Sequence, residues 1–131
     1  MIKLLAPEQV ISINKKICLH FKHFHHCVEP GKVESALHSA YYPGSPPFRY
    51  GGLAKVAGAM AFFLVKAHAF VDGNKRTGAL ASVMFMDLNG YNIRDVENPD
   101  AFYEIVNGCA AGTVSKDEMI DWYDTHKVKT S

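Results

Sequence analysis

The sequence predicts an all-α fold. Apolar residues recur three or four positions apart along most of the 131 residues, the spacing that places them on one face of a helix. Proline, glycine and capping residues divide these stretches into six helical segments, and runs that alternate between apolar and polar residues are almost absent. The length fits one domain, so we expect residues 1–131 to share a single hydrophobic core.

Composition and charge are those of an ordinary globular domain. Hydrophobic residues make up 48% of the chain, charged residues 21%, and the formal net charge is +1. So balanced a charge predicts neither DNA wrapping nor adhesion to a membrane surface, and no apolar run reaches the roughly 18 residues of a membrane-spanning helix. The N-terminus lacks a signal-peptide pattern and three irregularly spaced cysteines suggest reduced thiols, so we expect a cytoplasmic protein.

Proline marks the first two helices. The first is expected to begin at Pro7, a favoured first-turn residue. Its apolar residues are Val10, Ile13, Ile17, Phe21 and Phe24. A turn at 29–31 leads to the second helix, which should end before Pro43. The apolar side of that helix consists of Val33, Ala36, Leu37, Ala40 and Tyr41.

Residues 42–52 are too rich in proline and glycine for a helix, and they predict an ordered flap or short hairpin. The third helix, expected over 53–67, is apolar around most of its circumference, which predicts burial on several sides. Its Gly58 costs about 1 kcal/mol relative to alanine. We therefore expect another helix to pack closely against Gly58.

The fourth helix is expected over 74–88 and stops at Asn89-Gly90. Its apolar stripe is predicted to be Leu80, Val83, Met84 and Leu88.

Two more helices complete the chain. The fifth begins near Asn98, carries Cys109 on its apolar face and stops at Gly112. The sixth opens with a capping box at 115–118. The last residues, 127–131, are expected to be frayed.

The beginning of the fourth helix predicts an anion site. The first backbone N–H groups of a helix lack internal partners, and the helix dipole favours negative charge there. Gly73 lets a phosphate approach the backbone without a Cβ in the way, and Lys75 and Arg76 add two positive charges. These cations oppose the dipole at a cost of up to about 1 kcal/mol, which a bound anion explains better than stability does.

Asp72 and His68 supply further chemistry beside this anion site. One carboxylate together with substrate phosphates is the usual way of holding Mg²⁺ in nucleotide sites, which makes Asp72 a candidate ligand. His68 ends the third helix, and because imidazole titrates near neutral pH it can accept a proton from an attacking hydroxyl. Phe70 is expected to point inward and anchor the loop to the core.

Each of these residues also has a purely structural interpretation. Asp72 could cap the fourth helix, His68 could be an ordinary C-terminal helix histidine, and a Lys-Arg pair is usually a solvated face. Their occurrence together within residues 68–78 favours a functional site.

The pattern His68-x-Phe70-x-Asp72-Gly73-Asn74-Lys75-Arg76 resembles the signature of the Fic/Doc family. Residues 30–37 and 85–90 are similar to Doc proteins, the death-on-curing toxins. The resemblance implies a six-helix Fic fold whose motif loop holds ATP and Mg²⁺, with the flap before the third helix positioning a target protein.

For single residues, the resemblance implies that His68 deprotonates a target hydroxyl and that Asp72 binds Mg²⁺. The phosphates would be held by the other motif residues: the Gly73 backbone, Asn74, Lys75, Arg76 and Thr77.

Two departures from the adenylyl-transferring members bear on the reaction. Lys75 stands where those members usually carry glycine, and Ala79 stands where they carry a second arginine. The resemblance to Doc therefore implies reversed nucleotide binding and phosphorylation of a threonine on a translation elongation factor. Protein adenylylation and a non-catalytic nucleotide-binding domain are the alternatives.

The resemblance also implies a partner. No segment matches the inhibitory helix of some Fic proteins, Ser/Thr-x-x-x-Glu-Gly/Asn, so a separate antitoxin chain is expected to silence the toxin. Phe48 and Tyr50 are exposed aromatic candidates that such a partner could contact, whereas Trp122 is expected in the core. Direct nucleic-acid binding is not expected, because the sequence offers only Lys15-Lys16 and Lys75-Arg76 toward a basic patch.

Histidines and cysteines near the end of the first helix form a second candidate site. They are Cys18, His20, His23, His25, His26 and Cys27. Their spacing matches no standard zinc finger, so a metal site is only weakly indicated. Histidines also suit the last turn of a helix electrostatically, and this interpretation is favoured.

Overall fold

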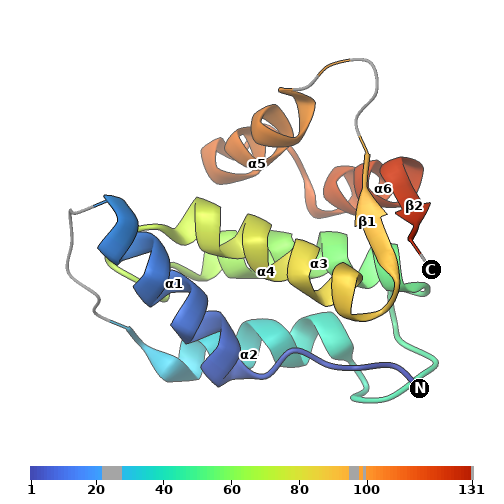
Figure 1. Ribbon diagram of the computed structural model, residues 1–131, viewed down its shortest axis with the longest axis horizontal. Coiled ribbons are helices and arrows are strands. Elements are labelled where there is room, and N and C mark those ends of the chain that lie inside the picture. Colours follow the sequence, from blue (N-terminus) through green and yellow to red (C-terminus); the bar gives the residue numbers. More distant parts are fainter. Residues whose placement is uncertain (22–27, 95–97, 99, 131) are drawn as a thin grey trace.

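The computed structural model describes residues 1–21, 28–94, 98 and 100–130 (Figure 1). Within them six helices and two short strands follow one another: α1 (Pro7–Phe21), α2 (Pro30–Tyr41), α3 (Leu53–Ala67), α4 (Asn74–Leu88), β1 (Tyr91–Ile93), α5 (Ala101–Ala111), α6 (Lys116–His126) and β2 (Lys127–Lys129). This architecture confirms the predicted six-helix, all-α fold. No helix in the described part of the chain is long and apolar enough to cross a membrane.

Helix α3 lies at the centre of the molecule. It packs against α2 on one side, α4 on another and α6 on a third, while α1 packs against α4 and α2 (Figure 1). Val56, Ala57 and Met60 of α3 are fully buried, as the apolar circumference of this helix predicts. The core therefore surrounds a single helix whose C-terminal end leads directly into the polar loop 68–73.

Close packing around α3 depends on glycine. A Cβ placed on Gly58 would lie 2.8 Å from the carbonyl oxygen of Met119 in α6, which confirms the predicted close approach of another helix. A Cβ on Gly78 of α4 would lie 2.8 Å from a methyl carbon of Val65. Both helices therefore come nearer to α3 than a side chain would allow.

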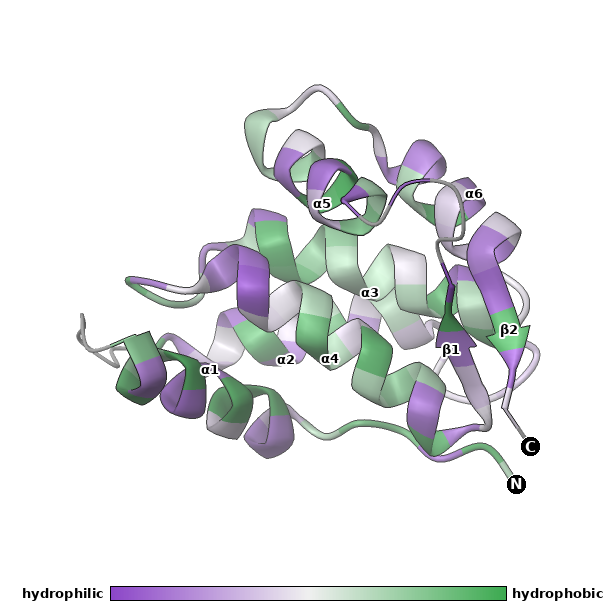
Figure 2. Cartoon of the chain, turned by 45° about the horizontal axis from the view of Figure 1, so that its top comes forward, coloured by the Kyte–Doolittle hydropathy of each residue, from purple (hydrophilic) through white to green (hydrophobic). Residues whose placement is uncertain are grey.

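The predicted buried face of α4 is wrong. Leu80, Met84 and Leu88 are exposed, with 51%, 39% and 37% of their surfaces accessible. The residues of α4 that face the core are Thr77, Gly78, Ala81, Ser82, Phe85 and Met86. Gly78 lets α4 approach α3 closely, and the large side chains of Phe85 and Met86 are fully buried on the same face. Leu80, Met84 and Leu88 remain on the outside, and green, hydrophobic segments of α4 run beside α1 in Figure 2.

The faces of α1 and α2 follow the prediction with one exception. The predicted apolar residues of α2 are all buried, and so are Val10, Ile13 and Ile17 of α1. Phe21, at the end of α1, is instead 39% exposed, and Phe24 lies outside the described residues.

The expectation that the chain end is frayed is wrong for residues 127–130. β2 pairs antiparallel with β1, with Tyr91 opposite Lys129, and the two strands lie side by side in Figure 1 and Figure 2. Beyond the strands, the Thr130 N–H donates to the carbonyl of Gly90 at 2.8 Å. The pairing joins segments far apart in the sequence, so neither strand carries a local signal strong enough to predict it.

Residues 42–52 form the ordered turn expected before α3, with the Arg49 N–H donating to the Tyr42 carbonyl at 2.7 Å. Phe48 is not exposed as predicted: it is 7% accessible and lies beside Tyr41, with ring centres 6.4 Å apart. The turn precedes α3 and the motif loop follows it, so about 22 Å of helix separate them.

Candidate active site

The candidate site is the loop of residues 68–73 that joins α3 to α4. His68 ends α3 in the left-handed conformation, with φ 49° and ψ 45°. Among the described residues it is the only non-glycine residue with positive φ. A left-handed residue other than glycine costs about 1 kcal/mol or more, a cost that tends to be retained where a side chain has a task. The imidazole of His68 is exposed to solvent.

The first half of the loop is fixed to the core and to the segment before α2. Ala69 and Phe70 are 2% and 6% exposed, which confirms that Phe70 points inward. The Glu29 N–H donates to the Ala69 carbonyl at 2.8 Å, and Val28 forms an antiparallel bridge with Phe70. The segment that contacts the motif is therefore 28–29, rather than the turn at 42–52.

Asn74 closes the loop on itself. Its Nδ2 donates to the Phe70 carbonyl at 2.8 Å, and its Oδ1 accepts from the Phe70 N–H at 3.2 Å. Both functions of the amide are thus used on the backbone of one residue. Asn74, predicted as a phosphate ligand, holds the loop in this structure.

The side-chain amide of Asn14 supports the loop from the protein interior. Asn14 of α1 is fully buried, and its Nδ2 donates to the Asp72 carbonyl at 2.8 Å and to the Thr77 hydroxyl at 3.1 Å. Thr77 is 1% exposed. The Thr77 side chain, predicted among the phosphate-binding residues, therefore faces Asn14 in the interior.

The N-terminus of α4 is open. Its N-cap is Gly73, with φ 78°, and no side chain caps it, so Asp72 does not take the structural capping role. Helix geometry leaves the N–H groups of the first turn without intrahelical acceptors, and the exposed Asp72 side chain lies next to them in the chain. This arrangement offers N–H donors and one carboxylate at the same end of a helix.

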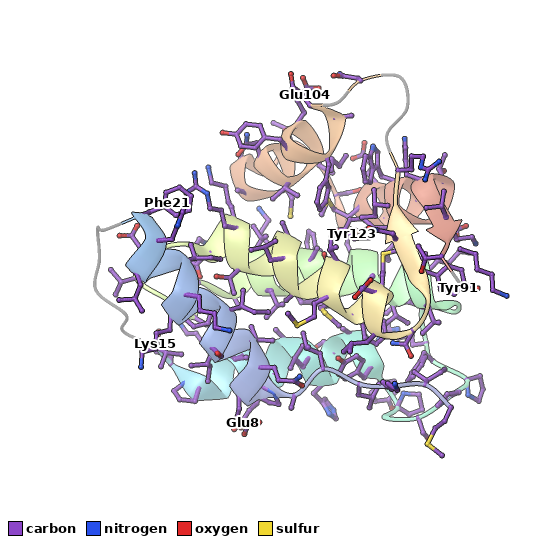
Figure 3. All side chains as sticks on the ribbon, in the orientation of Figure 1. Glu8, Lys15, Phe21, Tyr91, Glu104 and Tyr123 are labelled. Carbon is purple, nitrogen blue, oxygen red and sulfur yellow. The ribbon has the colours of Figure 1, made fainter. Side chains whose placement is uncertain are left out.

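Lys75 and Arg76 extend from this first turn to two other helices. The Lys75 Nζ donates to Oδ1 of Asn107 in α5 at 3.2 Å. The guanidinium carbon of Arg76 lies 4.0 Å from the centre of the Phe21 ring at the end of α1, where Figure 3 labels Phe21. Both cations are exposed, so they remain available to an anion at the loop.

These features coincide with a family match. The model of the Fic/DOC family matches residues 4–86, well over half of the chain, and the match includes the whole loop 68–73. The chain belongs to the Fic/DOC family. Members of this family transfer nucleotide or phosphate groups to proteins, and membership supports a Fic-type transferase function in this general sense. No curated protein matches the chain.

Three residues that contact the Fic/DOC motif were not predicted as part of the site: Asn14, Phe21 and Asn107. Asn14 could have been found from the sequence, because it is a polar residue on the otherwise apolar face of α1. A buried amide requires hydrogen-bond partners. The contacts of Phe21 and Asn107 depend on how α1 and α5 pack beside α4. The pattern of residues along the chain gives no indication of that packing.

The described cysteines are poor nucleophiles in this Fic/DOC domain. Burial, and secondarily the charge of Asp72, raises the pKa of the Cys18 thiol. Burial raises the pKa of the Cys109 thiol as well, against a smaller opposing effect of Lys66. A raised pKa leaves less of the reactive thiolate. Of the weakly indicated zinc cluster only Cys18 and His20 are described; His23, His25, His26 and Cys27 lie outside the described residues.

Proposed function

We propose that this Fic/DOC domain is a Doc-like toxin of a toxin–antitoxin pair that phosphorylates a protein hydroxyl in the cytoplasm. The target we propose is a threonine of a translation elongation factor, so that the modification blocks translation. The observation that carries the proposal is a double departure from the adenylyl-transferring pattern. Lys75 follows Asn74 in the motif, and Ala79 stands in place of a second arginine. Doc toxins share this departure from the adenylyl-transferring pattern.

The position of Lys75 supports this assignment. Its side chain extends from the first turn of α4 to Asn107 on α5, and so occupies the space between the two helices. A glycine at this position would leave that space open to the distal phosphates of a nucleotide bound for adenylyl transfer. With lysine there, the reversed orientation, which presents the γ-phosphate to the loop, is favoured.

The residues present fit ATP and Mg²⁺. The uncapped N-terminus of α4 and the Gly73 backbone offer N–H donors to phosphate oxygens, and Lys75 and Arg76 add positive charge. Asp72 would hold Mg²⁺, since its side chain is exposed and its carboxylate supplies the hard oxygen ligand that this ion prefers. When bound, Mg²⁺ neutralises charge on the phosphates.

His68 is the proposed general base. A ring nitrogen of His68 accepts the proton of the target hydroxyl, while the hydroxyl oxygen forms a bond to the γ-phosphorus. The bond between that phosphorus and the bridging oxygen breaks, and ADP leaves with the electron pair. The left-handed backbone at His68 and the fixed neighbours Ala69 and Phe70 hold the imidazole at the end of α3.

We further propose that a separate antitoxin chain covers the groove between α1 and α4. This groove has a volume of about 550 Å³ and is lined mainly by apolar side chains. They are Ile13, Ile17, Phe21, Leu80, Val83 and Met84. Exposed apolar surface of this kind marks an interaction site. Lys16, His20, Asp87 and Asn92 line the groove as well, so an amphipathic helix with polar residues of both charges beside its apolar face fits it best.

Growth and translation of bacteria that express the chain test the toxin function. We expect expression without an antitoxin to stop amino-acid incorporation before it stops RNA synthesis, and His68→Ala to abolish the effect. His38→Ala is the matched control, because His38 is an exposed histidine on α2, outside the loop, and this variant should arrest growth like the wild type. Arrest by His68→Ala as strong as by the wild type would contradict the proposal.

A further inference from the structure

The side-chain amide of Asn14 is buried and donates its hydrogen bonds to residues of the motif. It belongs to α1, is fully buried, and lies 58 positions before Asp72, whose carbonyl it binds. Burying an amide costs free energy unless its polar atoms are bonded. Nδ2 donates to the Asp72 carbonyl and the Thr77 hydroxyl, and Oδ1 is 3.6 Å from the Cys18 thiol. A polar group in the core is thus hydrogen-bonded to the backbone of the loop.

This contact fixes the direction of one peptide group. In a trans peptide the carbonyl and the following N–H point in opposite directions. Asn14 draws the Asp72 carbonyl toward the interior, so the Gly73 N–H of the same peptide points away from Asn14. Asn14 lies directly against this glycine, since a Cβ on Gly73 would be 3.1 Å from Nδ2.

Gly73 makes such a restraint necessary. Glycine occupies left-handed and right-handed conformations with similar ease, so the Asp72–Gly73 peptide could rotate in either direction without steric cost. Gly73, with φ 78°, is left-handed and is followed by the right-handed helical residue Asn74, and adjacent left-handed and right-handed residues bring successive backbone N–H groups together around an anion site. The side-chain amide of Asn74 holds the backbone of Phe70.

We propose that Asn14 is a positioning residue for phosphate binding: it holds the Asp72–Gly73 peptide so that the Gly73 N–H faces the bound phosphate. The proposal rests on the proposed function only in that the loop binds phosphate. Without the Asn14 amide, the peptide samples orientations in which the Asp72 carbonyl, rather than the Gly73 N–H, faces the anion. The chain then loses a donor and gains a repulsive acceptor at the same place.

The test compares pyrophosphate binding by the wild type and two variants of α1. Asn14→Leu keeps the volume but removes the donors, and we expect it to weaken pyrophosphate affinity about tenfold, the effect of losing a hydrogen bond to a charged group. Val10→Ala is the matched control, because Val10 is equally buried in α1 and is expected to lose stability without touching the loop. We expect its affinity to stay that of the wild type.

Isothermal titration with inorganic pyrophosphate, below the unfolding temperature of both variants, measures the affinities. Equal affinity of Asn14→Leu and the wild type overturns the proposal, as does an equal loss in Val10→Ala, which would indicate a general effect of lower stability.

A measurement on the wild type keeps the proposal testable if Asn14→Leu does not fold. Pyrophosphate should shift the amide proton resonance of Gly73, and shifts in other loop amides without Gly73 overturn the proposal. Because neither measurement requires group transfer, the two proposals fail separately. A domain that binds pyrophosphate through Gly73 but transfers no phosphate contradicts the proposed function and leaves the role of Asn14 intact.

Discussion

The guanidinium of Arg76 stacks on the ring of Phe21, with the guanidinium carbon 4.0 Å from the ring centre. Arg76 belongs to the Fic/DOC loop and first turn of α4, whereas Phe21 lines the groove between α1 and α4. One contact therefore connects the proposed phosphate site with the proposed antitoxin surface. A partner that covers Phe21 reaches the arginine of the motif without entering the loop.

Replacing the aromatic ring of Phe21 should lower the rate of catalysis more than it lowers the stability of the fold. A half-exposed cation–π contact contributes about 0.5–1 kcal/mol, so Phe21→Leu is expected to lower the rate of group transfer about two- to fivefold. The leucine keeps the groove apolar, and the unfolding temperature should change little. Leu19→Ala, which removes a 69% exposed residue from the same helix, is the control. Equal transfer rates for Phe21→Leu and wild type would show that Arg76 does not depend on the ring.

The left-handed backbone of His68 predicts a gain in stability from glycine. His68→Gly and His68→Ala should both be inactive, but His68→Gly should be more stable than His68→Ala by about 1 kcal/mol, because glycine adopts positive φ without steric cost. Thermal unfolding measures the difference, which corresponds to a few degrees in a domain of this size. If the alanine variant is the more stable one, the backbone at position 68 is not strained.

Alanine substitution at two helix glycines should change the free energy of unfolding in opposite directions. Gly58→Ala places a methyl group 2.8 Å from the Met119 carbonyl oxygen, and we expect a loss of about 1–3 kcal/mol in the free energy of unfolding. Gly31→Ala meets no atom within 4 Å in α2 and should stabilise the fold by up to about 1 kcal/mol. Urea unfolding measures both. A Gly58→Ala variant as stable as the wild type would mean that α6 can move away from α3.

Tyr41 predicts a loss of stability at alkaline pH. Burial raises the pKa of Tyr41 to about 12, against a smaller lowering by its hydrogen bond to the Leu5 backbone. An unfolded tyrosine loses its proton near pH 10, so above this pH the unfolded state is favoured and the free energy of unfolding falls. Burial also raises the pKa of Tyr123, so both tyrosines contribute to this fall.

Tyr41→Phe should therefore reduce, but not abolish, the alkaline loss of stability. At neutral pH it leaves the Leu5 N–H and carbonyl without the Tyr41 hydroxyl, which costs about 1–3 kcal/mol. Urea unfolding between about pH 8 and 11 gives the dependence. Tyr103→Phe, at a 67% exposed tyrosine, should follow the wild type. If Tyr41→Phe and the wild type show the same slope with pH, Tyr41 does not titrate as described.

Local signals predicted the helices well, because proline, glycine and the Ser115 capping box act within a few residues of the ends that they mark. The prediction failed where distant segments decide the structure. The close contact of Gly78 with α3 helps to set which face of α4 is buried, so Leu80 and Met84 face outward although their spacing predicted an apolar stripe. The pairing of β2 with β1 likewise joins the end of the chain to residues after α4.

The candidate site shows the same division. His68 and Asp72 could be predicted as site residues, because the motif that contains them is a short continuous stretch of sequence. What holds this stretch comes from elsewhere: Asn14 from α1, and Glu29 from the segment before α2. The turn 42–52 lies before α3, as the sequence predicts, and the motif loop follows the other end of this helix.

The most direct test of phosphoryl transfer is the position of the label that reaches a target protein. The chain is incubated with bacterial lysate and ATP labelled at either the α or the γ phosphate, with His68→Ala as the control. We predict protein-bound label from the γ phosphate alone, and none with His68→Ala. Label from the α phosphate would contradict the account in favour of adenylylation, and label from neither would leave a domain that binds nucleotide without transferring any part of it.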